Sequence, residues 1–448
     1  MRWMSRCFGA GFVGTLVACD SGPTGESAAR IEVSTEVHED VPTVVTVRWT
    51  TPEAVRSHLE YGLEGPGEVV LAEEAEPGRE HERVVLGLRA ETEYDARVVT
   101  EDGSTAEFTL ETGALDPELA RLTVTGTADL GAPFVLASTA GTTWGPIVLD
   151  AEGNIVWWHR ETEDFATTRA WLSRDGTAIF YNAMHDTHNE LSEAADGHLV
   201  RVPLDGGPVV NIPVPYLSHD FLELPDGSFA AIVLNQADID GAPVIGNALV
   251  EVTADGSGSR EVWNAFETLD PRTTTREDDS LSDWTHANAL DYDESADAWY
   301  LSLRNFGSIL KIDRPTGTLD WALSGSVNTF TFDDPAGRFR VSHQFEYRDG
   351  HMLVFDNGDA TRPYSRVLDL AVDEAALTAS LSGVYEPDTF VYILGDVHTL
   401  EDGSRLLALG TSGEIRRISA DGTVLCSAVA DLGHGFGYLQ PLDRFGPP

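Results

Sequence analysis

Histidines recur at matching places in a repeating pattern of the sequence, each near the start of an alternating apolar segment: His219, His286, His343 and His398. A neutral imidazole is a competent nucleophile and proton carrier near neutral pH. Arg304, at the end of another apolar segment, adds a guanidinium, which is well shaped to hold an oxyanion. Four histidines at one repeat position, of only 13 in the chain, therefore predict a functional site rather than four separate structural roles.

Further polar residues end the segments that follow. Asn357 ends one, and His185 and His188 end another, with Glu190 close by. Two histidines and a carboxylate offer ligands that suit zinc or another divalent ion. A metal-dependent hydrolase is therefore one alternative reading of these histidines, and a non-enzymatic ligand-binding protein is another.

The elements that must position these residues are short β-hairpins. Four units carry an Asp-Gly turn between two apolar runs, a pairing typical of tight hairpins: Asp175-Gly176, Asp226-Gly227, Asp349-Gly350 and Asp402-Gly403. The aspartates are 51, 123 and 53 residues apart, and the middle gap holds one further unit, turned at 293–298. A repeated β-unit of about 50 residues is the sequence mark of a β-propeller.

We predict an all-β chain whose larger part, residues 118–448, is a six-bladed β-propeller. The blades are expected at about 121–160, 165–217, 218–268, 284–326, 341–390 and 395–432. The segment 436–442 should close the first blade, whose early strands are expected from 121–138. Regular spacing favours this fold over a pair of stacked β-sandwiches.

Propeller geometry gathers the polar residues at one rim. The innermost strand of a blade begins at one face, the second strand returns to it, and the Asp-Gly turns lie at the other face. The four histidines that open first strands are thus expected to meet Arg304, Asn357, His185 and His188, which end second strands. The nearby aromatic residues Trp284, Phe306 and Phe345 could flank a bound phenyl ring or belong to the hydrophobic core of the propeller.

A smaller β-domain is predicted over residues 30–113. Six or seven short alternating segments fit within about 85 residues, the size of a β-sandwich. Trp49, Tyr61, Leu88 and Tyr94 resemble core positions of a fibronectin type III domain. We find no cluster of histidines or paired carboxylates in this part of the sequence.

Residues 1–18 have the pattern of a bacterial lipoprotein signal peptide. Arg2 and Arg6 precede a short apolar run that ends Leu16-Val17-Ala18-Cys19, which resembles a lipobox. Cleavage before Cys19 would leave a lipid on its sulfur, and residues 19–29 are small and polar like a tether. We therefore expect a lipid-anchored protein of the bacterial cell envelope; an ordinary signal peptide is the alternative.

The charge of the chain excludes one large class of partners. The net charge is −45, and losing Arg2 and Arg6 with the leader leaves 27 basic against 74 acidic residues, or −47. Such a surface repels phosphate, so no nucleic-acid partner is expected. After Cys19 the sequence has a single cysteine, Cys426, which excludes a cysteine zinc site and a disulfide within the body. The oligomeric state cannot be read from the sequence.

Several of these segments together resemble the bacterial arylsulfate sulfotransferase (arylsulfotransferase) family. The strongest match runs from Asp283-Trp-Thr-His286-Ala-Asn288 to Tyr300-Leu-Ser-Leu-Arg304, with the arginine eighteen residues after the histidine. Further matches are His343 with the later Phe-Asp-Asn357-Gly, the run from Ser218-His219 to Pro-Asp-Gly, and the opening hairpin from Gly145. The resemblance spans the whole predicted propeller.

This resemblance implies a six-bladed propeller and a specific reaction. A sulfuryl group would pass from a phenolic sulfate ester to a phenol without the nucleotide donor PAPS or any other cofactor. His343 would be the nucleophile and become sulfo-histidine; His219, His286 and Arg304 would hold the sulfuryl oxygens with help from Asn288. His398 and Asn357 are further candidates for substrate binding, and one of the histidines would protonate the leaving phenolate.

The sequence departs from the family in several places. Ser342 precedes the candidate nucleophile and Gln344 follows it, whereas in the family a glutamine precedes it. The family usually lacks a histidine at the position of His398, and the segment from His185 to Glu190 is extra. The partners implied are small molecules, an aryl sulfate donor and a phenolic acceptor, and the membrane through Cys19.

Overall fold

The computed structural model describes residues 30–119, 122–140, 144–161, 165–185, 191–277, 283–430 and 435–447, with the backbone of 14–16. The chain divides into two units, residues 1–120 with 154–157 and residues 121–153 with 158–448. The predicted leader, Cys19 and the tether lie outside the described residues, apart from that short backbone segment. No helix in the described ranges is long and apolar enough to cross a membrane.

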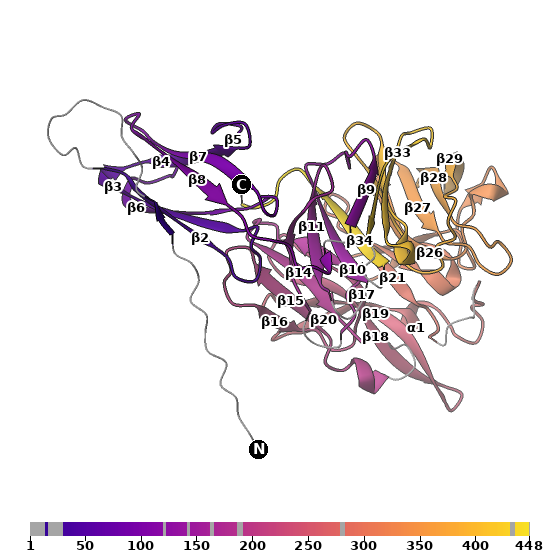
Figure 1. Cartoon of the computed structure of the whole chain (residues 1–448). Coiled ribbons are helices and arrows are strands. Elements are labelled where there is room, and N and C mark those ends of the chain that lie inside the picture. The colour runs from indigo at the N-terminus through magenta and orange to yellow at the C-terminus, as the bar shows by residue number, and fades with distance from the viewer. Residues whose placement is uncertain are drawn as a thin grey trace, which may run out of the picture. The chain divides into compact units, whose positions relative to one another are not determined.

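The first unit consists of two four-stranded β-sheets (Figure 1). One has the order β1 (Gly14–Leu16), β2 (Glu32–Val37), β3 (Val45–Val55), β6 (Gly78–Val85). The other has the order β5 (Val69–Val70), β4 (Ser57–Gly62), β7 (Glu93–Thr100), β8 (Thr105–Glu111). Buried and exposed residues alternate along β7 because successive side chains of a strand point to opposite faces.

The core of this unit contains the residues that the sequence singled out. Trp49, Tyr61, Leu88 and Tyr94 are all buried in one hydrophobic cluster. The backbone N–H of Arg89 donates to the Tyr94 hydroxyl at 2.8 Å, a tie from a tyrosine to the backbone a few residues upstream that β-sandwiches often use. The relation to fibronectin type III domains stays a prediction.

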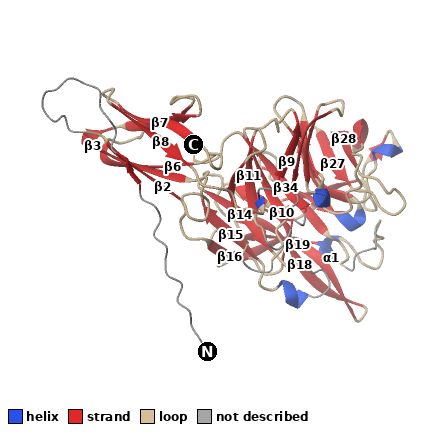
Figure 2. Ribbon diagram, in the orientation of Figure 1, coloured by secondary structure: helices blue, strands red, loops and turns tan. Residues whose placement is uncertain are grey.

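The second unit forms six sheets, of which the first also includes β12, a strand grouped mostly with the first unit. The sheets are antiparallel except for one added strand, and Figure 2 shows that strands make up most of this part of the chain. The first three have the orders β12 (Ile155–Trp158), β11 (Pro146–Asp150), β10 (Phe134–Ala140), β34 (Gly435–Leu442); β13 (Ala170–Leu172), β14 (Ala178–Ala183), β15 (His198–Pro203), β16 (Val210–Pro213); and β17 (Leu217–Glu223), β18 (Phe229–Ile239), β19 (Ala242–Val252), β20 (Ser259–Asn264).

The other three sheets follow the same plan. Their orders are β21 (Ala287–Asp293), β22 (Ala298–Leu303), β23 (Ser308–Asp313), β24 (Leu319–Leu323); β25 (Thr331–Phe332), β29 (Thr378–Tyr385), β28 (Arg366–Asp373), β27 (His351–Asp356), β26 (Ser342–Arg348); and β30 (Asp396–Thr399), β31 (Arg405–Ala408), β32 (Glu414–Ile418), β33 (Val424–Ala430), β9 (Leu122–Gly126). The short helices are η2 (Leu191–Ala194), α1 (Ala265–Thr268), η3 (Arg304–Phe306), η4 (Pro335–Gly337) and η5 (Gly410–Ser412).

The six sheets are the blades of a closed β-propeller, as predicted. The innermost strands adjoin one another in chain order, and β30 of the last blade adjoins β34 of the first. Strand β34 is the innermost strand of the first blade, so the prediction for 436–442 is confirmed. The placement of 121–126 in the first blade was wrong, because β9 pairs with β33 at the outer edge of the last blade (Figure 1). The C-terminal strand β34 thus completes the first blade, and β9, the first strand of the propeller in chain order, completes the last blade.

Candidate active site

Three inner strands carry a β-bulge where a predicted histidine stands. The register shifts between Leu217 and Phe221 in β17, between Ala287 and Ala289 in β21, and between Ser342 and Phe345 in β26. A bulge adds a residue to one strand and redirects its side chains. At two of the histidines, His219 and His286, φ is +48° and +47°. Non-glycine residues rarely adopt this left-handed conformation, and it clusters at functional sites.

His219 and His286 face each other across neighbouring blades. Their ring centroids are 4.6 Å apart in an edge-to-face arrangement, and both side chains are buried. Nδ1 of His286 lies 3.0 and 3.1 Å from the two carboxylate oxygens of the buried Asp283. Nδ1 of His219 lies 2.8 Å from the Ser218 hydroxyl. Each ring is therefore oriented through Nδ1.

His343 is the most deeply buried of the three histidines. Its Nδ1 lies 2.6 Å from Oδ1 of Asn357. The Asn357 amide donates to the carbonyls of Val391 and Leu394 at 2.8 and 2.7 Å, which identifies the atom facing the histidine as the oxygen. An amide oxygen only accepts hydrogen bonds, so Nδ1 of His343 carries the hydrogen and Nε2 holds the lone pair.

The environment of His343 also keeps the ring neutral. Burial lowers its pKa well below 6.5, and the charge of Arg304 and the proximity of His286 lower the pKa further, against the opposing hydrogen bond of Asn357. A neutral imidazole with a lone pair on Nε2 is nucleophilic without first losing a proton. His343 therefore keeps an unprotonated Nε2 over a wide pH range.

Arg304 lies beside this group of histidines. It opens η3, its backbone N–H donates to the carbonyl of His286 at 3.0 Å, and its guanidinium donates to Oδ1 of Asn305 at 2.9 Å. Only 1% of the residue is exposed. The structure thus brings together His219, His286, His343 and Arg304, as predicted, and we refer to these four residues as the histidine cluster.

Asn288 stands at the bulge of β21, next to the cluster. Its amide donates to the carbonyl of Ser342 at 2.8 Å. The amide oxygen is buried and accepts no hydrogen bond from the residues that the structure describes. A buried acceptor without a donor costs free energy unless a ligand or water supplies one. Asn288 and Asn357 thus both adjoin His343, the first through the backbone and the second through its side chain.

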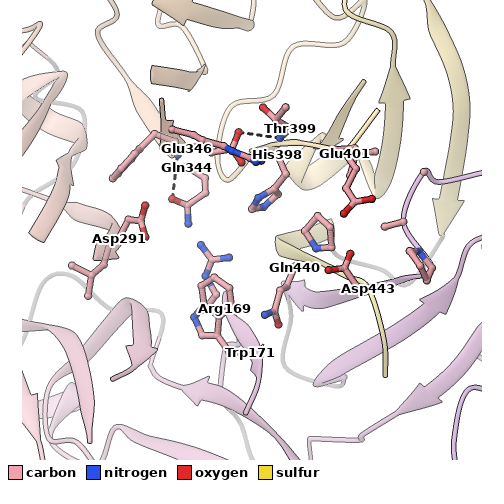
Figure 3. Close-up of a pocket in the computed structure, with 18 residues that line it drawn as sticks. Arg169, Trp171, Asp291, Gln344, Glu346, His398, Thr399, Glu401, Gln440 and Asp443 are labelled. Atoms are coloured by element: carbon pink, nitrogen blue, oxygen red, sulfur yellow. Dashed lines mark hydrogen bonds between the residues drawn. The ribbon is translucent and has the colours of Figure 1, made fainter. Parts of the chain in front are cut away.

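The structure does not place His398 with the histidine cluster. Strand β30 pairs with β31 in unbroken register, without the bulge that β17, β21 and β26 have. His398 consequently lies farther along its strand than His343 does, and it lines a separate pocket of about 520 Å³, whose residues Figure 3 shows. Because β21 and β26 line this pocket with residues that follow the bulges, the pocket lies toward the other end of the channel. Burial lowers its pKa, but the Asp396 carboxylate 2.9 Å from Nε2 raises it more, so the net shift is upward.

A buried polar layer lies between the histidine cluster and this pocket. Arg169 donates to both carboxylate oxygens of Asp220 at 2.9 and 3.3 Å, with both side chains almost fully buried. Asp220 also accepts from the side chain of Gln344 at 3.1 Å and the backbone of Leu290 at 3.0 Å. The Arg169 guanidinium lies over the Tyr438 ring. We refer to Arg169, Asp220, Gln344 and Tyr438 as the central layer.

The other predicted site residues have different surroundings. His185 pairs with Asp196 at 2.8 Å and packs on Phe165, whereas His188 lies outside the described residues. No group of three or more potential metal ligands occurs within the described ranges. Trp284, Phe306 and Phe345 are core residues of the blades, although Phe345 also borders the pocket of His398.

Sequence reasoning missed two elements of the site. Asp283 was quoted within a motif without a role, although an acidic residue three positions before a histidine is a visible signal. Arg169 and Asp220 went unnoticed because they are 51 residues apart and pair only across blades. Their repeat spacing, close to the blade length, is the one signal that would have linked them.

The sequence matches one known protein family. A family model described as arylsulfotransferase (ASST) matches residues 123–424. No curated protein gives a significant match to the sequence.

Solved structures with a similar fold are distant in sequence. A protein of unknown function from Bacteroides caccae is 12% identical, with 70% of this chain and 100% of that chain covered and a TM-score of 0.46. A periplasmic gluconolactonase from Pseudomonas aeruginosa is 15% identical, with 68% and 98% covered and a TM-score of 0.43. A virginiamycin B lyase from Staphylococcus aureus is 10% identical, with 77% and 93% covered and a TM-score of 0.39.

Proposed function

The chain belongs to the arylsulfotransferase family, and on that premise we propose that it transfers a sulfuryl group from a phenolic sulfate ester to a phenol through a sulfo-histidine at His343. The observation that carries this proposal is the hydrogen bond from Nδ1 of His343 to Asn357. It leaves the lone pair on Nε2, and the lowered pKa keeps that nitrogen unprotonated. Both are properties that a nucleophile needs.

In the first step Nε2 of His343 attacks the sulfur of the donor. A bond forms between nitrogen and sulfur, and the bond between sulfur and the phenolic oxygen breaks. The leaving phenolate takes a proton from Nε2 of His286, whose Nδ1 faces the Asp283 carboxylate. A buried carboxylate on one nitrogen orients the ring and supports the positive charge that it carries when it holds a second proton.

Arg304 and His219 hold the sulfuryl oxygens in this proposal. Sulfuryl transfer, like phosphoryl transfer, depends mainly on positioning and on compensating charge on the equatorial oxygens. A guanidinium with 1% exposure acts in a medium of low dielectric constant, where its charge is most effective. The left-handed backbone at His219 and His286 turns both rings toward each other at the start of their strands.

In the second step the oxygen of the acceptor phenol attacks the sulfur of sulfo-His343. The bond between sulfur and Nε2 breaks, and His286, which lost its proton in the first step, takes the proton of the phenol. The buried oxygen of Asn288 can accept the hydrogen bond of the incoming hydroxyl group. The cycle returns both histidines to their starting protonation states.

The test uses 4-nitrophenyl sulfate as donor and phenol as acceptor. We expect release of 4-nitrophenol that requires phenol, and a sulfuryl group on the His343 peptide in mass spectra of protein treated with donor alone. Release that needs no acceptor would indicate a sulfatase, and no release with any aryl sulfate would leave a ligand-binding protein. Either result would overturn the proposal.

We also propose that the protein is attached to the bacterial cell envelope by lipid on Cys19. The support is the sequence alone, with Leu16-Val17-Ala18-Cys19 after a short apolar run. Membrane fractions of cells that express the full chain should contain the protein, and C19S should move it to the soluble fraction. Equal membrane association of C19S would contradict the lipid anchor.

A further inference from the structure

The pocket near the other end of the channel takes no part in the proposed reaction. It lies beyond the central layer and is lined by later residues of the inner strands (Figure 3). Its volume of about 520 Å³ falls in the range of pockets that hold small organic molecules. The ionisable residues that line it, besides His398, are Asp291, Glu346, Glu401, Asp443, Arg169 and Arg348.

The positive charges of the pocket are largely committed elsewhere. Arg169 donates to Asp220 twice and to the carbonyl of Leu439 at 3.2 Å. The ring of His398 is held by the buried Asp396. Arg348 is exposed and lies 3.5 Å from Asp349. The lining therefore has more negative charge, from its four carboxylates, than uncommitted positive charge.

Asp291 is the most unusual of these carboxylates. Among the residues that the structure describes, only the backbone N–H of its neighbour Tyr292 donates to it, at 2.8 Å. Burial raises its pKa, and the charge of Glu346 raises it further, while Tyr292, Arg169 and His398 lower it. Two partly desolvated carboxylates that repel each other gain from a cation placed between them.

The remaining walls of the pocket are suited to an organic ligand. Trp171 and Phe345 contribute aromatic surface, and Pro133, Leu400 and Pro441 contribute aliphatic surface. Figure 3 shows Arg169, Gln344 and His398 directed toward the centre, with Asp291 on one side and Glu401 and Asp443 on the other. A bare metal ion does not fit this arrangement, because the described residues form no group of metal ligands here.

We propose that this pocket is a second binding site, for a small organic cation that places an ammonium group between Asp291 and Glu346. The ammonium group donates hydrogen bonds to both carboxylates, and its carbon chain packs on Trp171 and Phe345. The site is independent of the sulfuryl-transfer proposal, because it lies on the far side of the central layer from His343.

Isothermal titration calorimetry with 1,4-diaminobutane on the full propeller-containing chain tests the site. We expect saturable binding with one molecule per chain, and at least a tenfold rise in Kd in the double variant D291N/E346Q. The matched control is D333N, which removes an exposed carboxylate and should change Kd less than twofold. Binding of 1,4-butanediol or succinate as tight as that of the diamine, or equal Kd values in wild type and D291N/E346Q, would overturn the proposal.

A second measurement separates this site from attraction to the acidic surface and holds even if the double variant fails to fold. Acidification from pH 7 to 5 weakens binding at a carboxylate of raised pKa more than binding at ordinary carboxylates, because protonation of Asp291 sets in at a higher pH and the raised pKa of His398 favours the charged ring. Exposed carboxylates such as Asp255, whose hydrogen bonds with Ser257 lower its pKa to about 2, stay ionised in that range. Diamine affinity that is unchanged at pH 5 would therefore contradict a site at Asp291.

Discussion

The two ends of the propeller channel are built from the same inner strands, but the pKa of a buried histidine is lowered at one end and raised at the other. Burial lowers the pKa of both His343 and His398. Beside His343 stand Arg304 and His286, which lower the pKa further, whereas beside His398 stands Asp396, which reverses the shift. The neighbours of a buried histidine, and not burial alone, therefore decide whether the ring is neutral or charged.

The central layer keeps these two environments apart. Arg169 and Asp220 neutralise each other with side chains that are 2% and 0% exposed. The histidine cluster on one side is suited to anions, and the pocket on the other side is suited to cations.

The largest effect is expected at the histidine cluster. H343A should lower the rate of 4-nitrophenol release by about 10⁴-fold or more, because loss of the nucleophile removes the covalent route. The matched control is H351A, a histidine whose side chain is 52% exposed. If H343A retains a rate within tenfold of wild type while its mass spectrum shows no sulfuryl group, the reaction does not pass through His343.

Breaking the central layer should cost stability rather than chemistry. R169M leaves the Asp220 carboxylate buried without its counterion, a change that costs about 3–5 kcal/mol. R174M removes an exposed arginine paired with Glu294 and should cost less than about 1 kcal/mol. Urea unfolding of both variants gives the difference. Equal losses would mean that the central pair adds nothing to the fold.

Asn357 tests whether the tautomer of His343 matters. N357A should lower kcat about 10- to 100-fold, because the ring loses the partner that keeps the hydrogen on Nδ1. N357D keeps an acceptor but adds a negative charge that favours imidazolium. We therefore expect N357D to keep more activity than N357A at pH 8 and to lose it on acidification at a higher pH than wild type. Parallel pH profiles for all three proteins would contradict a positioning role.

The two histidines should contribute to stability with opposite dependence on pH. The unfolded chain protonates His343 near pH 6.5 and the folded protein does not, so this residue costs stability as pH falls below that value. His398, with a raised pKa, stabilises the fold below its unfolded pKa, and this contribution is lost as pH rises through the folded pKa. The Tm difference between wild type and H343Q should therefore grow from pH 5 to 7.5, and that for H398Q should shrink. Tm differences that change in the same direction with pH for both variants would contradict this account.

The smallest effect is expected from salt. The chain carries a formal charge of −45, which repels an aryl sulfate at long range, whereas Arg304 attracts it only at close range. Salt screens the long-range repulsion more than the buried attraction. KM for 4-nitrophenyl sulfate should therefore fall several-fold between 20 and 300 mM NaCl, by an order-of-magnitude argument. A KM that does not change with salt would contradict this account.

Much of the fold could be predicted because propellers repeat. The Asp-Gly turns and the spacing of the apolar segments identified six blades and the closing strand at the C-terminus. The strand at 122–126 was misplaced because nothing local indicates which of two edges a single strand will join. Likewise, the core of the first unit followed from alternation, since Trp49 and Tyr94 occupy the buried face of their strands.

The site was predictable to the extent that it follows chain order. His219, His286 and His343 meet because they share a position in their repeats, and Arg304 joins them because it follows the second strand of its blade at the same rim. His398 shares that pattern in the sequence but does not join them, because its strand lacks the bulge. A one-residue difference in strand register is invisible in a sequence of short apolar runs, and it moves a side chain to a different level of the channel.

The sequence by itself determined the repeat, and with it the fold and the rim at which His219, His286 and His343 gather. Only the tertiary structure decided which distant groups the histidines face: Arg304 and Asn357 for His343, and His286 for His219. The reason is physical. Strand formation follows from local alternation, whereas the protonation of a buried ring depends on the desolvation and charge around it, which are set by the packing of residues far apart in the chain.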